Sequence, residues 1–107
     1  MEGGHVVSEC PVNTSDGVKG VDVVWLSAAR HPGRDRYTVM KIAPEICVEI
    51  FSPSNTQAEM EERRRLFFER GAIEAWVCDE GRMQFFTKDG LIPRSQLCPE
   101  FPAEIRV

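Results

Sequence analysis

Short apolar segments recur along the chain, and most of them have the composition of β-strands rather than of long helices. The first two segments are joined by a polar stretch that closes with Asp16-Gly17, which is typical of a hairpin turn, so we expect them to pair antiparallel. The third segment is a continuous apolar run, which is typical of a central strand covered on both faces. The predicted strands are residues 5–12, 18–26, 45–51, 75–78 and 83–87.

One segment carries the signals of a helix. Thr56 is followed three residues later by Glu59, which is the pattern of a capping box, and Gly71 suits the position just after a helix end. These signals predict a helix from Thr56 to about Arg70. Because this helix lies between the third and fourth predicted strands, the three elements should form a βαβ-like unit.

The remaining segments are polar or rich in proline and glycine. Residues 27–36 should form a loop, residues 37–42 a short edge segment, and the tail from Leu91 should be irregular except near its end. At 107 residues the chain can bury one hydrophobic core, so we expect a single domain over residues 1–107. No apolar run approaches the roughly 18 residues of a membrane span, and the first residues lack a signal-peptide pattern. We therefore expect a cytoplasmic protein without membrane contact.

Two of the predicted strands carry an acidic residue among apolar neighbours. Glu49 lies inside the run PEICVEIFSPS, and Asp22 lies inside VDVVWL. An ionised carboxylate in a buried strand is costly unless a cation or hydrogen bonds stabilise it. If the two strands are neighbours in the sheet, both carboxylates can point to one side and bind the same divalent cation. Either residue taken alone could instead occupy an edge strand and face water.

Arg63 is a third unusual residue. At about 100° per residue it falls on the apolar side of the predicted helix, between Leu66 and Phe67. An arginine that points inward beside carboxylates could bind a phosphate group through its guanidinium. It could equally lay its stem on the core and reach the solvent, or pair with Glu59, four residues before it.

The overall charge restricts what the chain can bind. Seventeen acidic and thirteen basic residues give a net charge of −4. Tight nonspecific binding of nucleic acid needs clustered Lys and Arg side chains that neutralise phosphates, and this composition argues against it. Any contact with nucleic acid should therefore be local or bridged by a metal ion.

Together these motifs resemble a family of bacterial restriction-endonuclease-like proteins with the PD-(D/E)xK nuclease core, first described as a domain of unknown function. That family has an aspartate-bearing strand, a stretch of the form P-D-L-V-V-E-V-L-S-P-S, and a helix with Asp and Lys four apart and an aromatic residue four later. The motif G-V-x-E-Y-W follows. The matching segments here lie between about Gly17 and Trp76, and they are Val21-Asp22, PEICVEIFSPS, Glu59 with Arg63 and Phe67, and GAIEAW.

The resemblance implies a restriction-endonuclease-like α/β fold with a mixed sheet and one main helix. It also implies a shortened N-terminal part, since members of the family usually carry a helical segment before the first strands. By the same resemblance, Asp22 and Glu49 would be ligands of Mg²⁺ or Mn²⁺, and DNA would be the partner whose phosphate is attacked by water. Arg63 stands where the family has lysine on the helix, and Phe51 stands where the general nuclease motif has lysine.

Two functions are compatible with these residues. The first is a metal-dependent DNA endonuclease with Asp22, Glu49 and Arg63 as catalytic residues. The second is a catalytically degenerate remnant that acts as a binding or dimerisation module, because arginine cannot serve as a proton-accepting base. The short chain and the apolar segment MQFF, which a small sheet could leave at an edge, also predict a homodimer.

Overall fold

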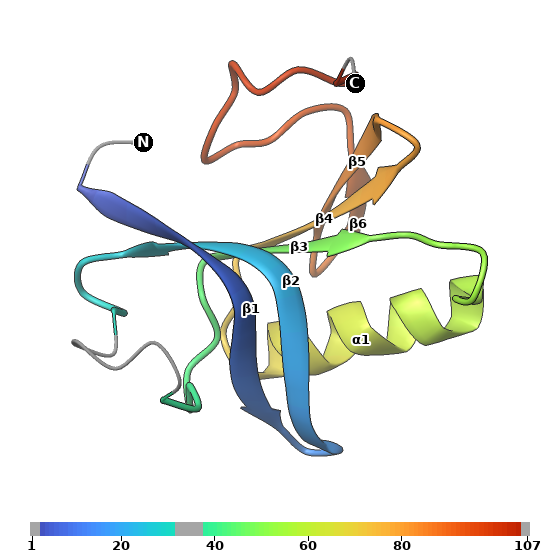
Figure 1. Ribbon diagram of the computed structural model, residues 1–107. Coiled ribbons are helices and arrows are strands. Elements are labelled where there is room, and N and C mark those ends of the chain that lie inside the picture. Colours follow the sequence, from blue (N-terminus) through green and yellow to red (C-terminus); the bar gives the residue numbers. More distant parts are fainter. Residues whose placement is uncertain (1–2, 32–37, 106–107) are drawn as a thin grey trace.

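The computed structural model describes residues 3–31 and 38–105, which form one six-stranded sheet with a helix on one side. The strands lie in the sheet in the same order as in the chain (Figure 1). The elements are β1 (Gly4–Thr14), β2 (Gly17–Ser27), β3 (Ile46–Ile50), α1 (Gln57–Glu69), β4 (Glu74–Asp79), β5 (Arg82–Thr87) and β6 (Gly90–Ile92). Neighbouring strands are antiparallel, apart from the parallel pair β3 and β4. This confirms the predicted mixed α/β sheet with one main helix.

The β1–β2 hairpin is long and bends near its middle (Figure 1). Glu9 has a φ of 52°, in the left-handed region, and the regular ladder between the two strands omits the position where Glu9 faces Asp22. A residue in this conformation interrupts the pleat and increases the local twist. As a result, Val21 and Val24, on either side of Asp22, both reach the same core.

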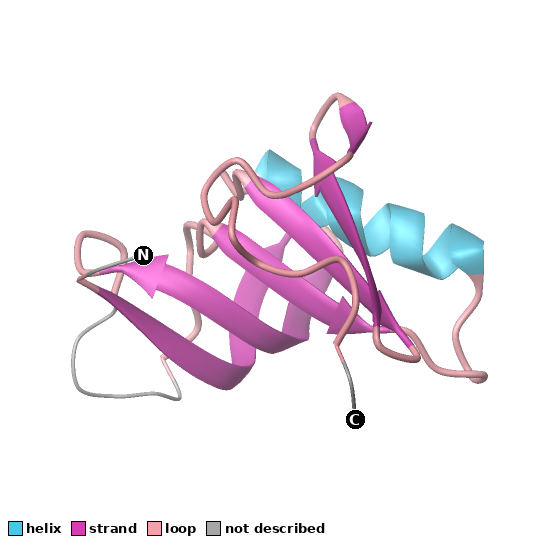
Figure 2. Cartoon of the chain, turned by 90° about the horizontal axis from the view of Figure 1, so that it is seen from above, coloured by secondary structure: helices cyan, strands magenta, loops and turns pink. Residues whose placement is uncertain are grey.

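Helix α1 begins and ends close to the predicted residues. Thr56 is the N-cap, and its hydroxyl accepts a hydrogen bond from the Glu59 amide at 3.1 Å. Gly71, just beyond the C-cap, has a φ of +99°, which glycine adopts without strain. The helix buries Met60, Leu66 and Phe67 and runs along one side of the sheet (Figure 2).

Two hydrophobic clusters lie on opposite faces of the sheet. The cluster on the helix side contains Phe67 of α1 with residues of β1, β2 and β3. The cluster on the other side contains Trp76 and Phe85, and the chain after β6 covers it. Phe101 from this tail packs on Trp76 with 4.6 Å between ring centroids, and the Met83 amide donates to the Ala103 carbonyl at 2.8 Å. The tail is therefore irregular but firmly packed, and it pairs with β5 near its end.

Two sequence-based expectations about the edges of the sheet are wrong. The tail from Leu91 is expected to be irregular, but strand β6 includes its first two residues, so the sheet has one strand more than predicted. The segment MQFF does not lie at an edge, because β5 lies between β4 and β6 and its Met83 and Phe85 side chains are buried.

Parts of the predicted loop at 27–36 and of the segment at 37–42 fall outside the described residues. Within the described part, Met40 forms a single parallel bridge with Val12. No helix in residues 3–31 and 38–105 is long and apolar enough to cross a membrane.

Candidate active site

Glu49 occupies the centre of the sheet, on the short strand β3 between β2 and β4. Its side chain is only 5% exposed and points to the helix side, the same side as Cys47. An edge position facing water is thereby excluded for this residue. A carboxylate at this depth requires a partner, because burial without one disfavours its charged form.

Asp22 faces Glu49 from the neighbouring strand. The β2–β3 ladder pairs Val23 with Val48 and Val24 with Cys47, and extending this register by one residue places Asp22 opposite Glu49. The Oδ2 atom of Asp22 accepts a hydrogen bond from the backbone N–H of Ile50 at 2.8 Å. The side chain thus closes the end of the ladder, and its carboxylate is held beside that of Glu49.

Arg63 reaches the same place from α1. Its Nε and Nη2 atoms both contact Oε1 of Glu49 at 2.6 Å, and Nη2 also donates to the Gly20 carbonyl at 2.7 Å. The guanidinium carbon lies 5.5 Å from the centre of the Phe67 ring, and the side chain is 27% exposed. Arg63 therefore points toward the sheet, as expected, but its ion pair is with Glu49 on β3. The Glu59 carboxylate instead accepts from the Thr56 hydroxyl at 3.2 Å.

The charges of Asp22, Glu49 and Arg63 do not cancel when both carboxylates are ionised. Burial raises the pKa of Glu49 above its usual range. The hydrogen bond and charge of Arg63 offset only part of this rise, and the neighbouring charge of Asp22 adds to it. With both carboxylates ionised, one guanidinium balances two negative charges, so the site favours the approach of a further cation.

The donor set is compatible with a hard divalent cation. Two carboxylates on neighbouring strands offer oxygen ligands, which Mg²⁺ and Mn²⁺ prefer. In the part of the chain that the structure describes, no group of three or more His, Cys, Asp or Glu side chains is arranged to hold a metal. Two carboxylates are nevertheless a usual protein contribution for Mg²⁺, which keeps several waters and binds substrate phosphates.

Another buried acidic residue, Glu74, stabilises the fold and does not belong to this site. It is completely buried at the start of β4, and Oε1 accepts from Trp76 Nε1 at 2.8 Å and from Ser95 Oγ at 2.6 Å. Oε2 accepts from the amides of Gln96 and Leu97 at 2.8 and 2.9 Å. The motif GAIEAW marks this position in the sequence, but only the fold shows that the carboxylate fastens the tail to the sheet.

The chain has a restriction-endonuclease-like α/β fold: its mixed sheet contains a β3–α1–β4 crossover, and Glu49 of the central strand contacts Arg63 of the helix. The chain belongs to the Uma2 family, described as "Putative restriction endonuclease", whose family model matches residues 2–105. No curated protein matches the chain.

A similar solved structure supports the assignment of the fold. It is described as a putative nuclease belonging to DUF820 from Anabaena variabilis, and it superposes with a TM-score of 0.65 at 19% sequence identity. The similarity covers 95% of this chain and 65% of that one, so this chain spans somewhat less than two thirds of the length of the other protein. At this identity the comparison establishes the fold alone.

Proposed function

We propose that the chain is a metal-dependent DNA endonuclease that hydrolyses phosphodiester bonds. The observation that supports this best is that Arg63 contacts Glu49, while Asp22 lies opposite Glu49 on the neighbouring strand and accepts a hydrogen bond from the Ile50 amide. Membership in a family described as restriction endonucleases suggests DNA as the partner. Mg²⁺ or Mn²⁺ is the cofactor that suits the carboxylate pair.

Each group has its own task in this proposal. Asp22 and Glu49 bind the cation through their carboxylate oxygens at the end of the β2–β3 ladder. When bound, the cation activates a water molecule and stabilises the charge that develops on the phosphate. Arg63 binds a phosphate oxygen and orients the phosphate, because a guanidinium is a strong donor to such oxygens. It does not accept the proton of the water, since a guanidinium has donors and no acceptor.

Cleavage of supercoiled plasmid in the presence of Mn²⁺ tests the proposal. Wild type should nick the plasmid, chelation of the metal should stop the reaction, and Asp22→Asn should remove it. Asp89→Asn is the matched control, because Asp89 lies exposed in the turn before β6. The proposal is wrong if pure wild type leaves the plasmid intact, or if Asp22→Asn nicks it as fast as wild type.

A second function, a catalytically silent binding module, is favoured by one observation: Arg63 already occupies Oε1 of Glu49. Substitutions of Arg63 separate the two functions. For an active site, Arg63→Lys should keep or raise nicking by restoring a lysine, and Arg63→Ala should abolish it. For a silent module, neither variant nicks DNA. Arg63→Ala lowers the melting temperature in either case, because Glu49 is left buried without its partner, so nicking is the readout that separates the two functions.

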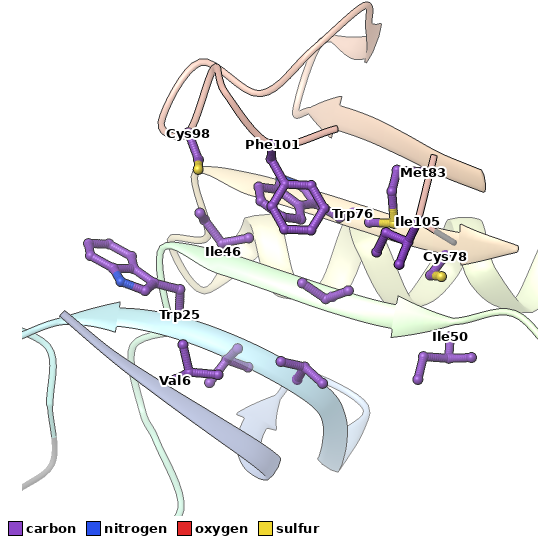
Figure 3. A pocket seen from close by; sticks show the side chains of 13 residues that line it. Val6, Trp25, Ile46, Ile50, Trp76, Cys78, Met83, Cys98, Phe101 and Ile105 are labelled. Atoms are coloured by element: carbon purple, nitrogen blue, oxygen red, sulfur yellow. The ribbon is translucent and has the colours of Figure 1, made fainter. Parts of the chain in front are cut away.

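We further propose that the protein acts as a homodimer. On the face opposite α1, a groove of about 340 Å³ is lined by apolar side chains that include Trp25, Ile46 and Phe101 (Figure 3). Val6 and Ile50, which also line it, are 74% and 54% exposed. Contiguous apolar surface of this kind favours association. Light scattering should give twice the chain mass for wild type and a monomer for Val6→Lys, and a monomeric wild type at high concentration would refute the dimer.

A cytoplasmic location completes the proposal, because that is where bacterial DNA would be accessible to such an enzyme. Fractionation of cells that express the chain checks it: recovery in the membrane or secreted fraction would contradict the expectation.

A further inference from the structure

The guanidinium of Arg63 and a divalent cation would need the same carboxylate. Both contacts from Arg63 to Glu49 end on one atom, Oε1, at 2.6 Å. Glu49 is 5% exposed, so solvent cannot take over as the partner of its charge while Arg63 is there. In the structure Arg63 thus acts as the counter-cation of Glu49.

The positive charges of Arg63 and of a divalent cation would repel each other at this site. A cation held by Asp22 and Glu49 would carry two positive charges to within a few ångströms of the guanidinium, where the repulsion is weakly screened because the carboxylate is buried. Arginine and metal therefore compete for Glu49, and binding of one weakens binding of the other by linkage.

The Arg63 side chain can turn away from Glu49 toward the solvent. Its side chain is 27% exposed, and its second contact, the Gly20 carbonyl, is itself on an exposed residue of β2. The guanidinium carbon lies 5.5 Å from the centre of the Phe67 ring. The head gives up this contact when it turns outward, but the long aliphatic stem lets it reach the solvent without moving the helix. An arginine released in this direction presents its free donors at the site surface, where a phosphate of DNA would approach.

We propose that Arg63 is an internal competitor of the metal, bound to Glu49 in the metal-free chain and displaced when a divalent cation binds there. This inference rests on the proposed function, since it assumes that Asp22 and Glu49 hold the cation. It assigns Arg63 a second role beyond phosphate binding: it stabilises the empty site and lowers the affinity for metal. The released guanidinium then binds phosphate, so metal and DNA bind cooperatively.

Metal binding to the full chain tests the competition. Calorimetric titration with Mn²⁺ compares wild type with Arg63→Gln, which keeps a long polar side chain but lacks the charge. Arg64→Gln is the matched control, because the neighbouring Arg64 lies 3.9 Å from the Phe86 ring on another side of the helix. Arg63→Gln should bind Mn²⁺ at least about tenfold more tightly than wild type, and the control should bind like wild type.

Thermal stability gives a second readout that does not depend on catalysis. Without metal, Arg63→Gln should melt below wild type, because Glu49 has lost its counter-charge. Saturating Mn²⁺ should raise the melting temperature of Arg63→Gln by more than that of wild type. If the glutamine variant fails to fold, nuclear magnetic resonance of wild type still follows the displacement directly. The Nε–H signal of Arg63 should shift on saturation with Mg²⁺.

The outcomes separate the two proposals. If neither wild type nor the variants bind Mn²⁺, the metal-dependent function fails and the competition with it. If wild type binds Mn²⁺ but Arg63→Gln binds it equally or less tightly, or if the Nε–H signal stays unchanged at saturating Mg²⁺, the competition alone is refuted and the metal site stands.

Discussion

Substitution of Glu74 should destabilise the protein strongly, although Glu74 lies outside the candidate active site. Each carboxylate oxygen of Glu74 accepts two hydrogen bonds. The donors to Oε1 are Trp76 and Ser95, and the donors to Oε2 are the backbone amides of Gln96 and Leu97. In Glu74→Gln the amide oxygen can keep the first pair. The NH₂ group then faces two backbone donors that it cannot satisfy.

The magnitude follows from those two donors. A buried donor left without its partner costs about 1–3 kcal/mol, so two of them cost about 2–6 kcal/mol. The lower part of this range applies, because Gln96 is exposed and its amide can reach water. At about 4 °C per kcal/mol for a domain of this size, a loss of about 2–4 kcal/mol lowers the melting temperature by about 8–16 °C.

Melting curves followed by circular dichroism measure this change, with Glu104→Gln as control. Glu104 lies in the same tail but is exposed, so its substitution should change stability by less than about 0.5 kcal/mol. Hydrogen exchange adds a local readout, because the Gln96 and Leu97 amides should exchange faster in Glu74→Gln. A variant that melts within about 2 °C of wild type, with both amides still protected, would refute the reasoning.

Two further predictions concern groups outside the site. Burial acts to raise the pKa of Glu45, but hydrogen bonds from Ser27 and the charge of Arg30 outweigh it and hold the pKa below its usual value of 4.5. A lowered pKa in the folded state stabilises the protein above about pH 4.5, and this stabilisation is lost as the pH falls through the folded pKa. Wild type should therefore melt above Glu45→Gln at pH 7, and the gap should close under acid; a gap that persists at pH 3 contradicts this. Glu9→Gly should raise the free energy of unfolding by up to about 1 kcal/mol, because glycine adopts the positive φ of residue 9 without strain. Denaturant titration measures this change. A loss of stability would show that the Glu9 side chain stabilises the fold by more than its backbone strain costs.

The region between Glu45 and Trp76 could be predicted well because its signals are local. A helix N-cap, a glycine after the helix and a continuous apolar strand each depend on a few neighbouring residues. Strand periodicity predicts Asp22 and Glu49 on one side of the sheet, and the register places them opposite each other, but periodicity does not predict the interruption of the β1–β2 ladder at Asp22. The metal-binding and catalytic roles of these residues stay predictions.

What the sequence could not show depends on distant partners or very short elements. The ion pair of Arg63 with Glu49 spans fourteen residues, whereas a helical pattern suggests only partners three or four residues away, such as Glu59. β6 has three residues, too few for a periodic pattern. The bend falls on Glu9, whose residue type does not indicate a positive φ, and Pro11 two residues later is the nearby sign of an irregular strand.

The order of the strands has a consequence for how the chain folds. Each strand pairs with the next one along the chain. Short turns connect most of these pairs, residues 28–45 connect β2 with β3, and the segment that contains α1 connects β3 with β4. The parallel pair must wait until α1 has formed and packed, and we expect this closure to limit the refolding rate. Phe67→Leu should therefore slow refolding, whereas Leu91→Ala on the outer strand β6 should mainly speed unfolding. Stopped-flow kinetics that show the reverse would place the folding nucleus in the β5–β6 hairpin instead.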